Sequence, residues 1–187
     1  MSEQLSSQSS QSCSNISEDK DNHKITQMVL SNIVKDRKDF SNIRNLNATN
    51  IKEVVNTKLK NDMTLLHLAC VFKNIQAVNF LLECGSDTNA KNYLDETPIY
   101  YAQDCITLEK LLEAGAKLDV VSKLKLSPLD FAVIHGRPTI IKYLIDKNHI
   151  PLETIQRKLS IPKTTNKEKT IMALGKFMME YDINCCY

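Results

Sequence analysis

The sequence of 187 residues is poor in glycine, and none of its four glycines belongs to a glycine-rich phosphate-binding loop. It contains no His-Glu-x-x-His pair and no Gly-x-Ser-x-Gly nucleophile elbow. No apolar run approaches the roughly 20 residues that a membrane-spanning helix requires. The first residues lack the basic-then-apolar pattern of a secretory signal. These absences argue against the common catalytic and membrane-inserted classes, and we expect no catalytic residues.

Cysteine and histidine do not occur at metal-ligand spacing. None of the six cysteines belongs to a Cys-x-x-Cys motif or to a Cys/His set with zinc spacing. His23, His135 and His149 have no acidic or cysteine partner at such a spacing. We therefore expect no metal, no cofactor and reduced thiols in an intracellular, cytoplasmic protein. The net charge of +2 is too small to indicate a nucleic acid or an anionic membrane as the partner.

The composition carries a hint about origin. Lysine outnumbers arginine by 20 to 4, and asparagine and isoleucine are frequent. This bias is typical of AT-rich genomes, such as those of many intracellular microbes and some large viruses. It raises the hypothesis that the protein is an effector or regulator that acts inside a host cell.

One pattern recurs along the chain. Thr64 and Thr97 begin two copies, and a third copy begins at Ser127 after a slightly shorter interval. A recurrence at such intervals indicates a repeat architecture. Each copy predicts a first helix, a turn and a second helix, and Pro98 is placed where a helix tolerates proline. Gly85, Gly115 and Asn148 follow the second helices, where a left-handed residue commonly ends a helix.

These residues resemble the ankyrin-repeat family, whose pattern is Thr-Pro-Leu-His-x-Ala-Ala, a turn glycine, a helix ending in Leu-Leu, and Gly-Ala-Asp-x-Asn. The first copy reads Thr-Leu-Leu-His-Leu-Ala-Cys at 64–70 and keeps the family's histidine as His67. The resemblance implies an all-α solenoid of helix-turn-helix pairs joined by hairpin loops, in which His67 is structural. Lys73 replaces a turn glycine, and Tyr100 and Asp130 replace the histidine. A three-residue deletion near 103–106 shortens the second copy.

The flanking regions do not follow the repeat. Residues 1–20 hold eight serines and three glutamines, which predicts disorder. Ile25, Met28, Val29 and Ile33 form the apolar stripe of an amphipathic helix. We expect these segments: a disordered tail at 1–22, a helical N-terminal cap or degenerate repeat at 23–60, repeats at 61–91, 92–121 and 122–149, a two-helix C-terminal cap at 150–183, and a tail at 184–187.

The resemblance implies a monomeric, non-enzymatic module that binds another protein through its concave face. The variable positions of that face map onto Met63, Val71, Phe72, Tyr93, Leu94, Glu96, Asp104, Lys123, Leu124, Ile134 and His135. Their apolar members either form an exposed patch or are covered by the N-terminal helical segment. Two further hypotheses stay open. Cys185 and Cys186 could carry lipid and tether an adaptor to a membrane, or the chain could hold an unrecognised catalytic site.

Overall fold

The computed structural model describes residues 9–37, 40, 43, 48–147, 149 and 151. Within these ranges the chain forms helices and no β-strand. The elements are, in chain order, α1 (Ser9–Val34), α3 (Ala48–Val55), the 3₁₀ turn η1 (Lys60–Asp62), α4 (Leu65–Val71), α5 (Ile75–Glu83), the 3₁₀ turn η2 (Pro98–Tyr101), α6 (Cys105–Glu113), α7 (Pro128–Ile134) and α8 (Pro138–Asp146).

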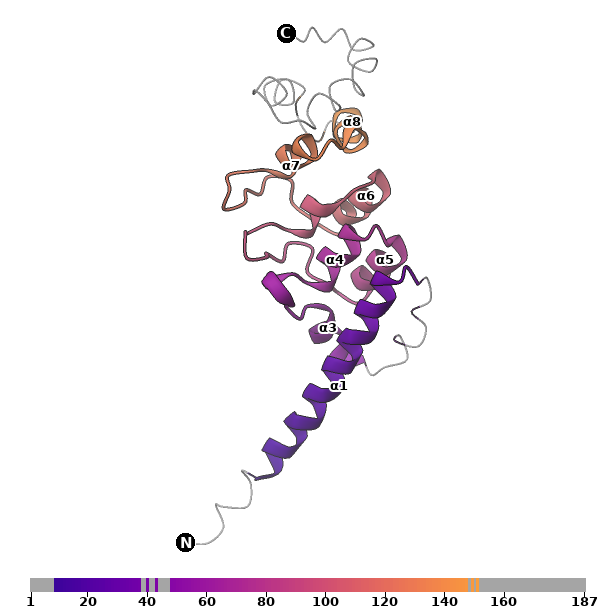
Figure 1. Ribbon diagram of the computed structural model, residues 1–187, viewed down its shortest axis with the longest axis vertical. Coiled ribbons are helices and arrows are strands. Elements are labelled where there is room, and N and C mark those ends of the chain that lie inside the picture. Colours follow the sequence, from indigo (N-terminus) through magenta and orange to yellow (C-terminus); the bar gives the residue numbers. More distant parts are fainter. Residues whose placement is uncertain are drawn as a thin grey trace, which may run out of the picture.

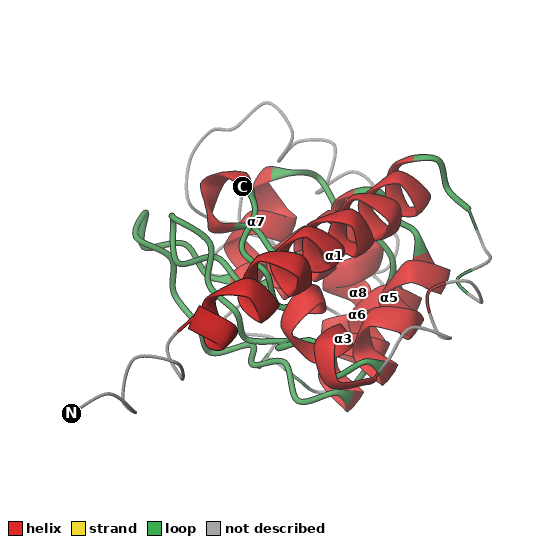
Figure 2. Ribbon diagram, turned by 90° about the horizontal axis from the view of Figure 1, so that it is seen from below, coloured by secondary structure: helices red, strands yellow, loops and turns green. Residues whose placement is uncertain are grey.

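The helices stack in two layers (Figures 1 and 2). The inner layer runs α1, α4, η2 and α7, with each element packed on the next. The outer layer holds α3, α5, α6 and α8, and α6 packs on both α5 and α8. Loops between successive pairs project to one side of the stack (Figure 1). This is the helical solenoid that the residue pattern predicts.

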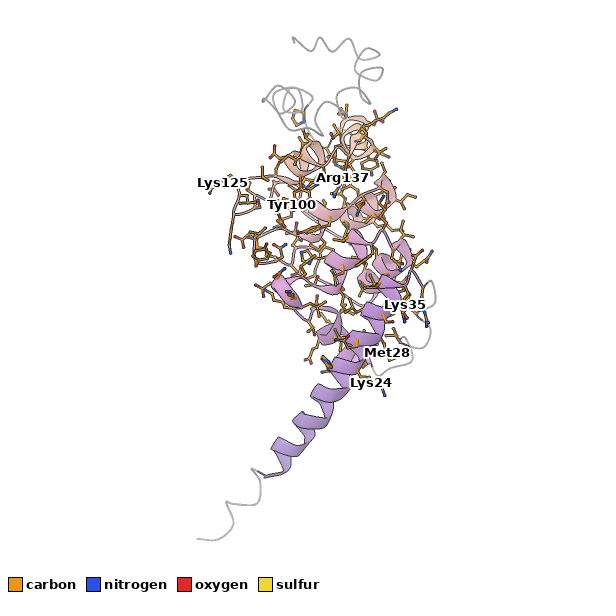
Figure 3. All side chains as sticks on the ribbon, viewed as in Figure 1. Lys24, Met28, Lys35, Tyr100, Lys125 and Arg137 are labelled. Atoms are coloured by element: carbon orange, nitrogen blue, oxygen red, sulfur yellow. The ribbon has the colours of Figure 1, made fainter. Side chains whose placement is uncertain are left out.

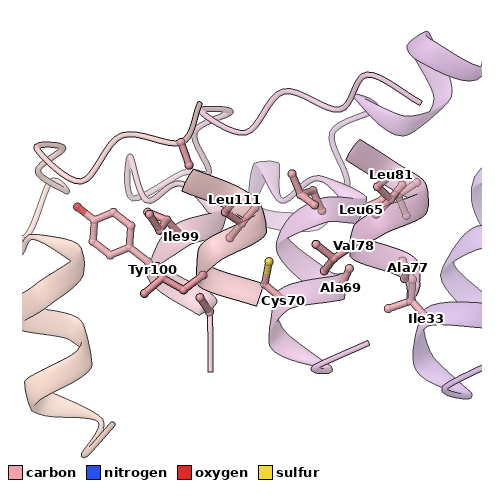
Figure 4. Close-up of a cluster of buried hydrophobic side chains, with 14 of the residues drawn as sticks. Ile33, Leu65, Ala69, Cys70, Ala77, Val78, Leu81, Ile99, Tyr100 and Leu111 are labelled. Atoms are coloured by element: carbon pink, nitrogen blue, oxygen red, sulfur yellow. The ribbon is translucent and has the colours of Figure 1, made fainter. Parts of the chain in front are cut away.

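A continuous apolar core lies between the layers, as the close-up of its central part shows (Figure 4). Leu65 and Cys70 from α4 and Val78 and Leu81 from α5 all belong to this core, and all four side chains are fully buried. Burying one such aliphatic side chain contributes about 1.5–3 kcal/mol. Because each pair of helices buries its face only against its neighbours, the stack owes its stability to contacts between repeats.

Local signals set where the outer helices begin and end. The Asn74 side chain accepts a hydrogen bond from the Ala77 amide at 2.9 Å, which caps α5. Gly85 and Gly115 follow α5 and α6 with φ of +80° and +86°, as their positions in the repeat predict. Asn148, which we expect in the same role after α8, lies outside the described residues.

The second repeat departs from the prediction of an ordinary first helix after Thr97. The segment Pro98–Tyr101 is a four-residue 3₁₀ turn, whereas α4 in the first repeat has seven residues. The outer helices α5 and α6 both keep nine residues. The three-residue deletion is therefore absorbed by the inner helix, because the outer helix must stay long enough to pack against both neighbours.

The N-terminal segment is more helical than its composition predicts. Helix α1 begins at Ser9, within the segment 1–22 that we expect to be disordered. Its later part is anchored by Val29 and Ile33, which are fully buried, although Met28 of the expected stripe is 39% exposed. A helix nucleated by such packing can extend backwards, because propagation costs far less than nucleation. Figure 1 shows the first half of α1 extending beyond the stack.

Helix α3 packs on α1, and Asn56 directly after it bonds to the turn that follows α5 in the first recognisable repeat. The Asn56 side chain donates to the Gly85 carbonyl at 3.2 Å and accepts from the Asp87 amide at 2.7 Å. Asn89 makes the same two bonds one repeat later, to Gly115 at 2.9 Å and from Lys117 at 3.0 Å. The interval from Asn56 to Asn89 equals that from Thr64 to Thr97, so these bonds follow the repeat period. At the same interval α3 corresponds to the end of α5 and the turn after it, and not to the whole outer helix. A helical N-terminal cap and a degenerate repeat both remain predictions for 23–60.

The C-terminal segments cannot be compared with their predictions. Of the expected cap at 150–183, the structure describes Pro151 alone, and the tail with Cys185 and Cys186 lies outside the described residues.

Candidate protein-binding face

Three hairpin loops project beside the inner helices, and we call them fingers 1 to 3: Leu59–Met63, Asn92–Glu96 and Ser122–Leu126. In each finger the first residue donates its amide hydrogen to the carbonyl of the last, at 2.7, 3.0 and 2.9 Å respectively. Neighbouring fingers are also joined, because Tyr93 donates to the Asn61 carbonyl at 3.1 Å and Lys123 donates to the Leu94 carbonyl at 2.8 Å. The fingers therefore form one hydrogen-bonded row.

His67 has the structural role that the resemblance implies. Its Nδ1 accepts from the Thr64 amide at 3.0 Å, so the proton resides on Nε2, which donates to the Glu96 carbonyl in finger 2 at 3.1 Å. The ring is fully buried, and this burial lowers the pKa of His67 below its ordinary value. The neutral imidazole therefore links the start of α4 to the next finger.

The two residues that replace this histidine each keep one of its two hydrogen-bonding roles. In the second repeat the Tyr100 hydroxyl donates to the Leu126 carbonyl of finger 3 at 2.8 Å, so it keeps the link to the next finger. In the third repeat Asp130 accepts from the Ser127 amide at 2.7 Å, so it keeps the bond at the start of α7. Both departures from the family pattern are thus accommodated by side chains of matching hydrogen-bonding capacity.

Glu96, one of the positions that the family resemblance maps onto the binding face, is buried. It is only 3% exposed, and its carboxylate accepts hydrogen bonds from the Asn92 side chain at 2.9 Å and from the Tyr101 hydroxyl at 2.5 Å. A buried carboxylate needs such donors to offset its desolvation. Glu96 therefore stabilises finger 2 from within and is not available to a partner.

Asp104 also has a structural partner. Its carboxylate accepts from the Thr107 amide at 2.7 Å and from the Thr107 hydroxyl at 3.0 Å, which caps α6. It remains half-buried, so a capping role accounts for an acidic residue at this position.

The other predicted residues separate into two groups at opposite ends of the inner helices. Met63, Tyr93, Leu94, Lys123 and Leu124 lie in the fingers, whereas Val71, Phe72, Ile134 and His135 lie at or just after the C-terminal ends of α4 and α7. A helix of the length of α4 separates the groups by roughly 10 Å.

The N-terminal helix does not cover the exposed members of these groups. Phe72 is 47% exposed, Tyr93 49% and Leu124 59%. Helix α1 instead packs on α3 and α4 at the end of the stack. Of the two alternatives for the apolar residues, the described part of the chain therefore favours the exposed patch.

Sequence reasoning missed the residues that connect the two groups. Leu68, Tyr101 and Phe131 occupy the same position in successive inner elements and are half-buried, and we call them the inner strip. The rings of Tyr101 and Phe131 lie 5.8 Å apart between centroids. Phe131 also contacts the exposed His135 ring, at 4.1 Å. Their recurrence directly after the family's histidine position in each copy was a usable signal.

Arg137 contacts the inner strip through the backbone of η2 and the ring of Phe131. Its guanidinium donates to the carbonyls of Tyr100 and Ala102 at 2.8 and 2.9 Å, and it lies 5.5 Å from the centroid of the Phe131 ring. These carbonyls end the shortened η2 turn, so a cation there satisfies groups that a longer helix would bond internally. The Tyr100 and Arg137 side chains lie close together in Figure 3.

Among the described residues, no group of three histidine, cysteine or acidic side chains could hold a metal ion. Burial raises the pKa of the Cys70 thiol far above its ordinary value, which suppresses its nucleophilicity. No helix in the described part of the chain is long and apolar enough to cross a membrane.

The fold and this face together define a short helical-repeat solenoid with a fingered edge. The family model described as ankyrin repeats (3 copies) matches residues 66–155. This segment consists of ankyrin repeats, which indicate a protein–protein interaction module, and nothing in it indicates catalytic activity.

Two curated proteins of rodents are similar to part of this chain. Protein fem-1 homolog A-A of Mus musculus is 32% identical over 82 residues, which covers 35% of this chain and 12% of the relative. Protein fem-1 homolog A of Rattus norvegicus is 30% identical with the same coverage. The chain thus spans about one eighth of the length of these curated relatives.

Proposed function

We propose that this protein binds a partner protein through the concave face formed by the fingers, the inner strip and the C-terminal ends of the inner helices. The observation that carries the proposal is the exposure of large apolar side chains in both groups of this face, above all Phe72 and Tyr93. A gathered set of exposed apolar residues on a soluble domain commonly marks an interaction site. Aromatic side chains are also the residues that dominate binding energy at protein interfaces.

The geometry supports a preformed site. Backbone hydrogen bonds join each finger to the next, and buried groups such as His67 and Glu96 fix the fingers from behind. A partner would therefore meet a surface that loses little conformational entropy on binding. The half-buried rings of Tyr101 and Phe131 supply the apolar floor between the fingers and the helix ends.

The setting is proposed on compositional grounds. The lysine-rich, arginine-poor composition supports a monomeric effector or regulator that acts in the cytoplasm of a host cell. Labelled protein expressed in its native host should then be found in the cytoplasm; a purely extracellular location would contradict the proposal.

Affinity capture with mass spectrometry tests the binding face directly. Phe72→Asp combined with Tyr93→Asp places two carboxylates on the proposed face, and both residues are exposed enough to spare the fold. The matched control is Met28→Asp combined with Ile106→Asp, at exposed apolar positions 39% and 58% accessible on α1 and α6.

The expected result is a partner that wild type and control retain and that the Phe72/Tyr93 variant loses, with unchanged helicity by circular dichroism. Equal loss of the partner in both double variants would place the interaction elsewhere.

A further inference from the structure

Positive charge gathers along the fingers although the whole chain has a net charge of only +2. We call the finger loops with their approaches, residues 57–63, 90–96 and 117–126, the finger edge. It carries six exposed lysines: Lys58, Lys60, Lys91, Lys117, Lys123 and Lys125. Its acidic residues are Asp62, Asp95, Asp119 and the buried Glu96.

The outer layer has the opposite balance. Its helices α3, α5, α6 and α8 carry five acidic residues against three basic ones: Glu53, Glu83, Glu109, Glu113 and Asp146 against Lys52, Lys110 and Lys142. The charges of the repeats are thus separated between two sides of the stack. An approaching molecule with negative charge would be directed to the finger edge, because a local potential depends on how charge is distributed and not only on its sum.

Exposed apolar side chains lie within this basic edge. Tyr93 of finger 2 is 49% exposed, Leu124 of finger 3 is 59% exposed and the neighbouring Val121 is 54% exposed. The two fingers are held together by the bond from the Lys123 amide to the Leu94 carbonyl, and by a second bond from the Lys123 ammonium to the Tyr93 carbonyl at 2.6 Å. The apolar group therefore sits on a fixed support.

Lysines stand on both sides of this apolar group. Lys91 precedes Tyr93 in finger 2, and Lys125 follows Leu124 at the outer end of finger 3 (Figure 3). Both lysines are exposed. The arrangement offers an apolar contact in the centre with cations at its rim, which is the usual anatomy of a protein interface.

We propose that the finger edge binds an acidic peptide segment of the partner that carries a large apolar side chain. This inference rests on the proposed function and names the partner's chemistry. The apolar side chain would contact Tyr93 and Leu124, and flanking carboxylates would pair with Lys91 and Lys125. Charge complementarity at such a rim sets specificity and association rate.

A nucleic acid fits the same surface less well. A nucleic acid carries a phosphate on every nucleotide and would bring several of them close to Asp62, Asp95 and Asp119. The proposed peptide needs carboxylates only opposite Lys91 and Lys125. The exposed apolar group is largely aliphatic, whereas single-stranded nucleic acids are bound by several aromatic rings on which bases stack.

Binding of matched fluorescent peptides to the full chain tests the proposal. The first peptide has Glu residues on both sides of a central Leu-Tyr-Leu; the second keeps the Glu residues but has Ser in the centre; the third keeps Leu-Tyr-Leu but has Lys in place of Glu. A single-stranded oligouridylate of similar length serves as the nucleic-acid probe. We expect the first peptide to bind at least about tenfold more tightly than the others, with affinity that falls as salt is raised.

Charge reversal locates the site. Lys91→Glu combined with Lys125→Glu should weaken binding of the acidic-apolar peptide by about tenfold or more. The control, Lys24→Glu combined with Lys110→Glu, changes the net charge by the same amount on α1 and α6 and should leave binding nearly unchanged. Lys123 is kept because its ammonium supports Tyr93.

Each contrary result overturns the proposal in a recognisable way. Tighter binding of the oligouridylate would assign the edge to nucleic acid, and tighter binding of the Lys peptide would reverse the partner's charge. Equal loss in the two charge-reversed variants would show only long-range attraction. In any of these cases a captured partner that is lost in the Phe72/Tyr93 variant would leave the proposed function standing, so the two failures can be told apart.

Discussion

The Tyr100 hydroxyl lies 2.8 Å from the carbonyl oxygen of Leu126, in the finger of the following repeat. His67 makes the equivalent contact one repeat earlier, from Nε2 to the Glu96 carbonyl at 3.1 Å. Glu96 and Leu126 are the last residues of their fingers and close them in the same way. The hydrogen bond between each of these inner elements and the next finger is thus kept, although a different side chain donates it.

Tyr100→Phe should lower the free energy of unfolding by about 1 kcal/mol. The ring stays buried, so its packing is preserved, and the Leu126 carbonyl keeps its bond from the Ser122 amide at 2.9 Å. Only the contacts of the phenolic hydroxyl with the Leu126 and Val120 carbonyls are lost. Urea unfolding followed by circular dichroism measures the change. Tyr143→Phe is the control, because its hydroxyl bonds Glu109 at 3.2 Å near the surface and should contribute little; equal effects of the two changes would contradict the role of Tyr100.

His67 should make the protein less stable as pH falls below about 6.5, the ordinary pKa of histidine. Burial lowers the pKa of His67 in the folded state, so the unfolded chain binds a proton first. Stability from this group is therefore complete above the unfolded pKa and is lost as pH falls through the folded one. One such proton changes the free energy of unfolding by at most about 1.4 kcal/mol per pH unit.

Urea unfolding of wild type and of His67→Gln between about pH 7 and about pH 5.5 measures this slope. The variant should show a shallower dependence. His135→Gln is the comparison, because burial and Arg137 also lower the pKa of the exposed His135. If the pH dependence disappears in His135→Gln and persists in His67→Gln, it belongs to His135 and the prediction for His67 is contradicted.

Lys73→Gly should raise the free energy of unfolding by about 0.5–1 kcal/mol. Lys73 occupies the turn between α4 and α5 with φ of +56°, a left-handed conformation that an L side chain adopts at a cost. Its side chain is exposed, so no packing is lost. Gly136 holds the equivalent turn before α8 with φ of +63°. The reciprocal Gly136→Lys should destabilise by a similar amount, and unfolding midpoints of the two variants that move in the same direction would refute the argument.

Much of the fold could be predicted because the repeat pattern is local. Gly85 and Gly115 mark left-handed positions that few residues tolerate, and the spacing of Thr64 and Thr97 gives the period directly. The conversion of Pro98–Tyr101 into a 3₁₀ turn could not be predicted. The deletion shows that one of the two helices of the second repeat must be shorter. The inner helix is the one that shortens, because α6 must pack against both α5 and α8.

The binding face stays a prediction, but the structure decides which of its residues are accessible. Of the two alternatives for the apolar residues, exposure holds for Phe72, Tyr93 and Leu124. Glu96 is buried instead, because Asn92 and Tyr101 donate hydrogen bonds to its carboxylate. These donors are only four and five residues away, but the repeat pattern does not say which side chains of a hairpin turn inwards.

The sequence by itself determined the all-α repeat, its period, the ends of the outer helices and the residue types available for contact, because these follow from propensity and from residues with special backbone freedom. Tertiary structure decided the bonds of Asn56 to the turn after α5, the burial of Glu96, the alignment of Tyr101 with Phe131 and the joining of fingers 2 and 3. The carboxylate of Glu96 is bonded within its own repeat. The other features depend on contacts between neighbouring segments of the stack, whose energies exist only once the helices have packed together.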